Sequence, residues 1–124
     1  MTIKLATVLQ LNNLLKSIID NTELKIDSLF KFRLLGIMKN IENPVNNFET
    51  IRNDKIREYG KEDEDGNIMI SKEDVDTLKK FTEDMDKVVD SDVEINIQKL
   101  KASDVFDKGL SADYLVGLYP IIEE

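Results

Sequence analysis

Hydrophobic residues recur at spacings of three and four along much of the chain, a pattern that predicts amphipathic helices. The first such stretch opens near Thr7, after a strand candidate at residues 2–5, and stops at the polar residues 20–22. The second opens near Asp27, a residue type favoured at helix N-caps, and keeps its period as far as Gly60. These stretches predict two helical segments in the first half of the chain.

The second stretch is interrupted by Asn43 and Pro44. Proline disfavours helix at its own position and at the residue before it. The hydrophobic period nevertheless continues beyond the proline without a slip. We therefore expect one kinked helix or two nearly coaxial helices, ending with Gly60 as a C′ glycine.

A third helical stretch is expected to begin at Ser71, with Asp74 completing a capping box. The acidic residues 61–67 before it predict a solvated loop with a tight turn. Residues 93–98 alternate between apolar and polar side chains, which is typical of a half-buried strand. A short helix capped by Ser111 is expected near the C-terminus.

Together these elements predict an α+β fold in a single domain covering residues 1–124. We expect a long kinked helix and a helical hairpin packed on a small antiparallel sheet of short strands. The long helix has a spare apolar side at Leu29, Phe32 and Leu35. Two alternatives account for it: a helix–helix contact in a homodimer, or a C-terminal tail packed over these residues.

Charge is distributed unevenly along the 124 residues. The net charge is −8, but residues 1–60 carry nine basic and seven acidic residues, whereas residues 61–124 carry eight basic and eighteen acidic ones. A non-specific nucleic-acid binder needs a basic surface to neutralise phosphates, so we expect no direct nucleic-acid contact. An acidic second half favours a partner with a basic surface.

Composition also limits the chemistry. The chain has no Cys and no His, which removes thiolate nucleophiles, imidazole bases and the usual zinc ligands. The acidic loop matches a calcium-binding loop only in part, because Lys61 and Lys72 stand where the ion needs carboxylates. No apolar run is long enough to span a membrane. We expect no catalytic residues, no metal site, no cofactor and no membrane contact.

One candidate binding site is basic and aromatic. Arg52, Arg57 and Tyr59 lie near the end of the long helical stretch, and Arg52 falls beside its apolar stripe. A partly buried arginine there needs an anion. The anion is either an acidic side chain of this chain or an external phosphate, as in a small nucleotide held in an arginine-lined pocket.

A second candidate set is acidic and would dock on a basic surface of a host protein or mimic nucleic acid. Its members are Asp63, Asp65, Asp84, Asp90 and Asp92. Binding of this kind would weaken strongly with salt.

Several segments of the chain carry a resemblance to a known group. They are the opening strand and Leu-rich helix, Phe48-Glu49 with Arg52, Glu58-Tyr59-Gly60, residues 63–67, the third helix, the strand at 92–95, and Ser111-Ala112-Asp113. In these segments the chain resembles small proteins of unknown function encoded by phages and prophages of Gram-positive bacteria. The resemblance implies a phage origin and synthesis in the host cytoplasm, and it implies no activity and no site residues.

These observations lead to two expectations of function. The first is a phage-encoded, non-enzymatic binding protein that acts on a host target, above all an anti-defence inhibitor. It would dock on a host protein through its acidic surface or sequester a nucleotide signal. The alternative is a structural or assembly accessory protein of the virion.

Overall fold

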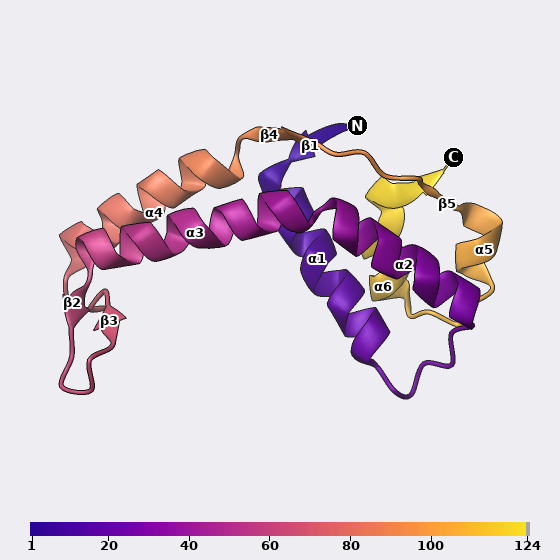
Figure 1. Cartoon of the computed structure of the whole chain (residues 1–124), viewed down its shortest axis with the longest axis horizontal. Helices are drawn as coiled ribbons and strands as arrows, with labels where there is room; N and C mark the ends of the chain where they lie inside the picture. The colour runs from indigo at the N-terminus through magenta and orange to yellow at the C-terminus, as the bar shows by residue number, and fades with distance from the viewer. Residues whose placement is uncertain (124) are drawn as a thin grey trace.

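The computed structural model describes residues 1–123, which form a globular lobe and a long helical arm (Figure 1). The lobe holds helices α1 (Leu5–Asp20), α2 (Ser28–Asn40), α5 (Ala102–Phe106) and α6 (Ala112–Leu118). The arm is formed by helices α3 (Glu42–Tyr59) and α4 (Val75–Val89). A 3₁₀ turn, Tyr119–Ile121, follows α6.

The strands are short and form three separate pairs. In chain order they are β1 (Thr2–Lys4), β2 (Lys61–Glu62), β3 (Ile68–Met69), β4 (Asp92–Glu94), β5 (Leu100–Lys101) and β6 (Ile122–Glu123). β1 pairs with β4 and β2 with β3, both antiparallel, whereas β5 and β6 are parallel. The α+β class is confirmed. The expected single sheet is replaced by these pairs, because strands of two or three residues are too short to cover the helices.

The hydrophobic core lies in the lobe, around α1. This helix buries Leu5, Val8, Leu11, Leu15 and Ile18, which follow one another at spacings of three and four. They form one stripe of the helix, as the sequence pattern predicts. Helices α2 and α6 pack against this stripe, and the chain from β4 to α5 closes the core.

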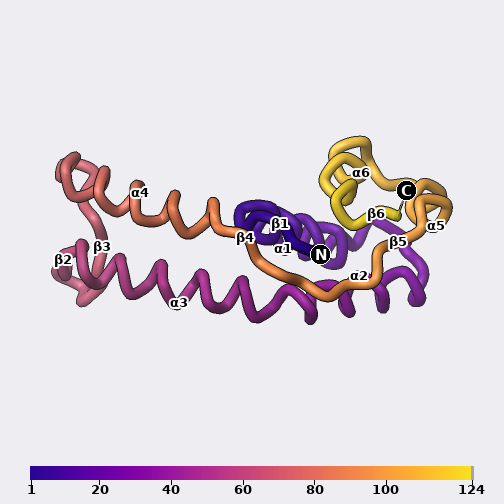
Figure 2. The backbone as a smooth tube through the Cα atoms, turned by 90° about the horizontal axis from the view of Figure 1, so that it is seen from above, coloured from indigo at the N-terminus to yellow at the C-terminus, as the bar shows by residue number. Residues whose placement is uncertain are grey.

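The break between α2 and α3 falls at Ile41, three residues before Pro44. Proline lacks an N–H and its ring clashes with the carbonyl four residues earlier, so the preceding helix must end there. Pro44 itself fits the first turn of α3, where the N–H would have no helical partner. The two helices follow each other end to end in the view of Figure 2 and meet at a clear bend in Figure 1, so the stretch is kinked at the proline as expected.

The extended segment after α4 is paired over a shorter length than the alternation predicts. Pairing ends where the Ile95 N–H donates to the Met1 carbonyl at 2.8 Å. No strand of residues 1–123 lies beside residues 96–99, so they continue as an irregular connection. Burial still alternates, with Ile95 buried and Asn96 exposed, because the segment crosses the lobe with one side inward.

Two cap assignments differ from the sequence expectations. Asp74, and not Ser71, is the N-cap of α4, and its carboxylate accepts hydrogen bonds from the Thr77 N–H and hydroxyl. Gly60 is not left-handed, since its φ is −83°. A Cβ at Gly60 would lie 2.4 Å from the Ile56 carbonyl oxygen, so the glycine is needed because the chain turns back closely there.

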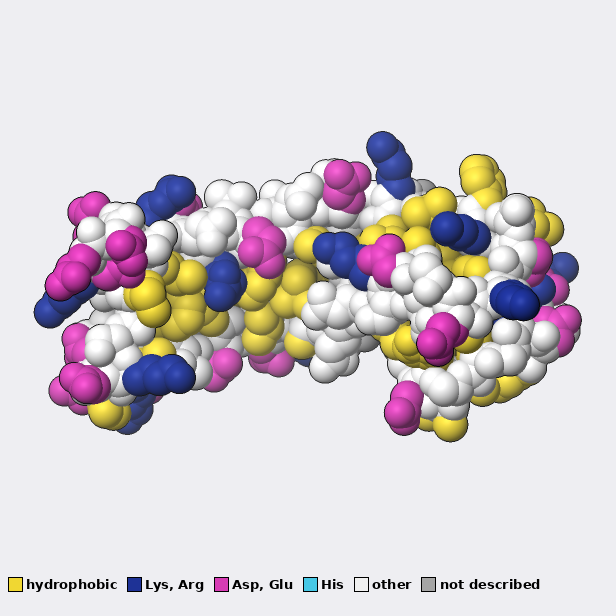
Figure 3. Space-filling model, turned by 90° about the horizontal axis from the view of Figure 1, so that it is seen from below, with side chains coloured by type: hydrophobic (Ala, Val, Ile, Leu, Met, Phe, Trp, Pro, Cys, Tyr) yellow, Lys and Arg dark blue, Asp and Glu magenta, His cyan; other side chains and the backbone are white. Residues whose placement is uncertain are grey.

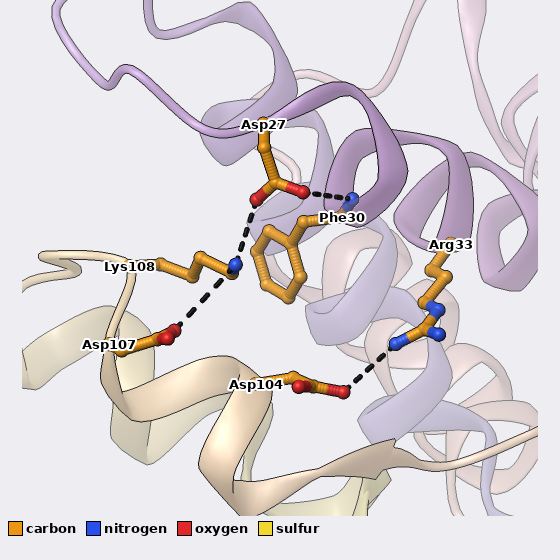
Figure 4. A network of polar contacts seen from close by, with 6 residues as sticks. All are labelled: Asp27, Phe30, Arg33, Asp104, Asp107 and Lys108. Atoms are coloured by element: carbon orange, nitrogen blue, oxygen red, sulfur yellow. Dashed lines mark hydrogen bonds and ion pairs between the residues drawn. The ribbon is translucent and has the colours of Figure 1, made fainter.

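A polar network ties the start of α2 to α5 and the turn that follows it (Figure 4). The Asp27 carboxylate caps α2 by accepting from the Phe30 N–H and lies 2.8 Å from Lys108 Nζ. This cation lowers the pKa of Asp27, and Asp27 in turn raises the pKa of Lys108. Arg33 adds a second link, 2.9 Å from Asp104. The network fixes α2 in place while leaving its outer side open.

That outer side is the spare apolar side expected from the sequence. Leu29, Phe32 and Leu35 are all exposed, and Phe32 reaches 73% exposure. The C-terminal segment as far as Glu123 does not cover them, which makes the packed-tail alternative wrong for residues 1–123. The homodimer alternative stays a prediction.

The arm has almost no buried interior. Helix α3 buries no residue and α4 buries only Met85. Two helices side by side can cover only the faces that touch, and Figure 3 shows hydrophobic side chains visible along the arm between them. The arm, residues 42–89, thus projects from the lobe and has the β2–β3 hairpin at its far end (Figures 1 and 2).

Candidate functional site

The basic candidates do not form a pocket. Arg52 is exposed, and no acidic side chain of residues 1–123 pairs with it. The expectation that Arg52 is partly buried is wrong, because a two-helix arm covers only one side of the stripe and a long arginine extends past it into solvent. Arg57 is also exposed and lies 3.7 Å from Asp54 on its own helix.

Tyr59 is held inside the arm. Its hydroxyl donates to Asp84 of α4 at 2.7 Å, and this hydrogen bond is the main cause that raises the pKa of Tyr59. Lys55 lies 3.0 Å from Glu58 and 4.0 Å from Asp84, with its ammonium 5.8 Å from the centre of the Tyr59 ring. The cluster fastens α3 to α4. Tyr59 belongs to the basic and aromatic candidate set and Asp84 to the acidic one, and the two side chains are hydrogen-bonded to each other.

A hollow of about 410 Å³ lies beside Tyr59, but neither Arg52 nor Arg57 lines it. Its other lining residues are Lys61, Met69, Ser71, Glu73 and Asp74. A nucleotide phosphate placed there would meet Glu73 and Asp74 as well as one lysine. The charges that line this hollow therefore offer an anion little electrostatic attraction.

The acidic candidates fall into three places. Asp84 lies within the arm, as described. Asp90 and Asp92 flank Lys4 where the arm meets the lobe, with Lys4 Nζ 3.3 Å from the Asp92 carboxylate and 3.8 Å from that of Asp90. Asp63 and Asp65 lie in the hairpin at the far end of the arm. The structure does not bring the five carboxylates together.

The hairpin forms an acidic tip, which we define as residues 61–76. This segment holds seven acidic residues and two lysines, a net charge of −5. Asp63 has a structural role there, since its carboxylate accepts from the N–H groups of Asp65 and Asn67. The other loop carboxylates are exposed and have no cation within ion-pair distance in residues 1–123. Figure 3 shows acidic side chains gathered at this end of the molecule.

The tip is also hydrophobic in part. Ile68, Met69 and Val75 are exposed there, with Met69 at 58%. Exposed apolar side chains surrounded by charges are typical of a surface that contacts another protein. The tip thus combines charge that steers an encounter with apolar area that stabilises a contact.

A second feature lies at the opposite end, in the lobe. A groove of about 640 Å³ runs between α2 and residues 98–101. Phe32, Arg33, Gly36 and Asn40 line one side, and Lys99 and Lys101 line the other, with Glu123 at one edge. Sequence reasoning missed this groove. Its only signal was Gly36 within an otherwise regular helical pattern, because glycine in a helix interior is unfavourable unless something uses the missing side chain.

Within residues 1–123, no three acidic side chains converge in a way that could hold a metal ion, and no helix is long and apolar enough to cross a membrane. Comparison with known proteins finds no family model, no curated protein and no solved structure that matches the chain.

Proposed function

We propose that this chain is a phage-encoded, non-enzymatic binding protein that docks on a basic surface of a host protein in the cytoplasm of the infected cell. An inhibitor of a host defence system is the most specific form of this proposal. One observation carries it: an arm with almost no buried interior holds an acidic, partly apolar tip far from the core. Helices α3 and α4 add little to the core, and this supports the view that their role is to present the tip.

The electrostatics of the tip favour a protein partner over a nucleotide. A net charge of −5 over sixteen residues repels phosphates and attracts a surface rich in Lys and Arg. The exposed Ile68 and Met69 offer apolar contact area, which a partner protein can bury and a small nucleotide cannot. We therefore propose docking through the tip and not the sequestration of a nucleotide by arginines.

The test compares host proteins captured by three forms of the tagged chain. The tip variant carries Glu62→Gln, Glu64→Gln and Asp65→Asn and keeps Asp63, whose carboxylate holds the turn. The control carries Glu42→Gln, Glu49→Gln and Asp113→Asn, which remove the same charge from exposed positions elsewhere.

We expect one host protein to bind the wild type and the control, and to lose at least tenfold affinity for the tip variant when both proteins are purified. The affinity should also fall between 50 and 300 mM salt, because contacts between exposed charges are screened. Equal binding of the tip variant and the wild type would refute docking through the tip.

A virion structural or assembly role is the second candidate, favoured by the elongated shape and by the groove at the end opposite the tip. It predicts that the chain is present in washed virions. Absence from washed particles, with a host complex formed in the same cells, would favour the first candidate.

A further inference from the structure

The two ends of the molecule carry opposite charge. Residues 25–40, which include α2, hold four basic residues and one acidic residue, and Lys99 and Lys101 lie across the groove from them. The tip at the other end carries a net charge of −5. Figure 3 shows basic and acidic side chains beside hydrophobic ones over the lobe, and several acidic side chains, with basic ones among them, at the arm's end.

The cations at the groove are largely unneutralised. Three cations line the groove. Arg33 pairs with Asp104, but no acidic side chain of residues 1–123 lies within ion-pair distance of Lys99 or Lys101. Glu123 at the groove edge pairs through its strand and not through an ion pair. An acidic occupant would therefore gain contacts with these two lysines at once.

Gly36 leaves room for that occupant. A Cβ built at Gly36 would have no atom within 4 Å, so nothing in this fold requires a glycine there. The absent side chain instead allows another chain to approach the helix backbone closely, next to the exposed ring of Phe32. The groove is thus both open and lined by an unpartnered aromatic side chain.

Charge decides between two ways in which a second copy could cover this surface. Pairing of α2 with α2 of another copy would bring two strongly basic segments together, which costs energy. The tip of another copy has the opposite charge, and its exposed Ile68 and Met69 offer apolar contacts to the exposed ring of Phe32 in the groove. The tip is the complementary surface that this chain offers.

We propose that the groove between α2 and residues 98–101 binds the acidic tip of a second copy, so that copies associate head to tail. Such a contact joins two different surfaces, and repeated contacts give an open chain or a closed ring. Association should grow with protein concentration, and it should weaken with salt because contacts between exposed charges are screened. A host protein docked on the tip would compete with it.

The experiment is sedimentation velocity of the wild-type chain from about 1 to 300 μM at low salt, with two charge-reversal variants. The groove variant carries Lys99→Glu and Lys101→Glu. The tip-reversal variant, which differs from the tip variant used to test host docking, carries Glu62→Lys and Asp65→Lys. We expect the wild type to form species larger than a dimer, each variant alone to stay monomeric, and an equimolar mixture of the two variants to associate again. Restored association in the mixture is the specific signature, because the groove variant keeps the wild-type tip and the other variant keeps the wild-type groove.

Two further variants separate the groove from a general effect of charge. Gly36→Leu fills the groove without changing charge and is expected to abolish association. Lys16→Glu with Lys87→Glu changes the net charge as much as the groove variant does, from exposed positions outside the groove, and should still associate.

A wild type that stays monomeric at 300 μM would overturn the proposal. Association that survives tip reversal but not Gly36→Leu would also overturn it and would assign the groove to α2–α2 pairing. Failure of self-association and failure of host docking are distinguishable. The groove variants keep the tip intact, so they should still capture the host protein.

Discussion

Gly36 gives the sharpest test of the lobe, because the fold itself does not use the missing side chain. A Cβ at this position meets no atom within 4 Å, and the backbone at Gly36 is not in the left-handed region. Glycine in a helix interior costs about 1 kcal/mol relative to alanine. Gly36→Ala is therefore expected to raise the free energy of unfolding by about 0.5–1 kcal/mol. With an unfolding entropy of about 2.1 cal/mol/K per residue, this corresponds to about 2–4 °C in Tm.

The measurement is urea and thermal unfolding followed by circular dichroism at low micromolar concentration. Gly117→Ala is the matched control, since it gains the same helix propensity in α6 but places a Cβ 2.6 Å from Leu14 Cδ2. Leu14 must then move, so the control should gain less than Gly36→Ala or lose stability. Unchanged or lowered stability in Gly36→Ala would mean that α2 has a contact or a strain at this position, and it would refute the reasoning about the open groove.

Three other outcomes are expected. Leu34→Ala removes a side chain with 0% exposure from the lobe core and should cost about 2–5 kcal/mol, measured by urea unfolding; a cost under 1 kcal/mol would contradict the packing. Gly60→Ala places a Cβ 2.4 Å from the Ile56 carbonyl oxygen, so amide hydrogen exchange in residues 61–70 should be faster than in the wild type while α1 stays protected. Unchanged exchange in residues 61–70 would speak against the close turn at Gly60. Because Lys108 lowers the pKa of Asp27, the stabilisation by this pair is complete above the ordinary value of 3.8 and is lost as pH falls through the lower folded pKa. Lys108→Met should therefore flatten the fall in urea midpoint between pH 5 and pH 2.5, and an unchanged slope would show that the pair does not contribute.

The sequence predicted the local structure well where one physical cause acts over a short range. The stripe from Leu5 to Ile18 predicted α1, although its start is two residues earlier than Thr7. Asp27 and Ser111 cap α2 and α6 as expected, because a cap depends only on the next three residues. Pro44 placed the break between α2 and α3 to within a few residues for the same reason.

Positions that depend on distant parts of the chain were not predictable in the same way. The exposure of Arg52 and the separation of Asp63 from Asp92 follow from the arm, which projects from the lobe and has solvent on most sides. A hydrophobic period shows that a residue lies on the apolar side of its helix, but not how much of that side another element covers. The hydrogen bond between Tyr59 and Asp84, 25 residues apart, likewise needs the register of α3 against α4.

The sequence by itself thus determined the longer helices, the caps at Asp27 and Ser111, the acidic second half and the absence of Cys and His. These follow from local backbone preferences and from composition, which need no knowledge of distant contacts. Only the tertiary structure decided that the acidic residues 61–76 form the tip of an arm and that the chain after β4 lies along α2 to form a groove with Lys99 and Lys101 at its edge. The reason is that a groove and a projecting tip are made by packing between segments far apart in the sequence, and the energy of that packing is set by the whole fold.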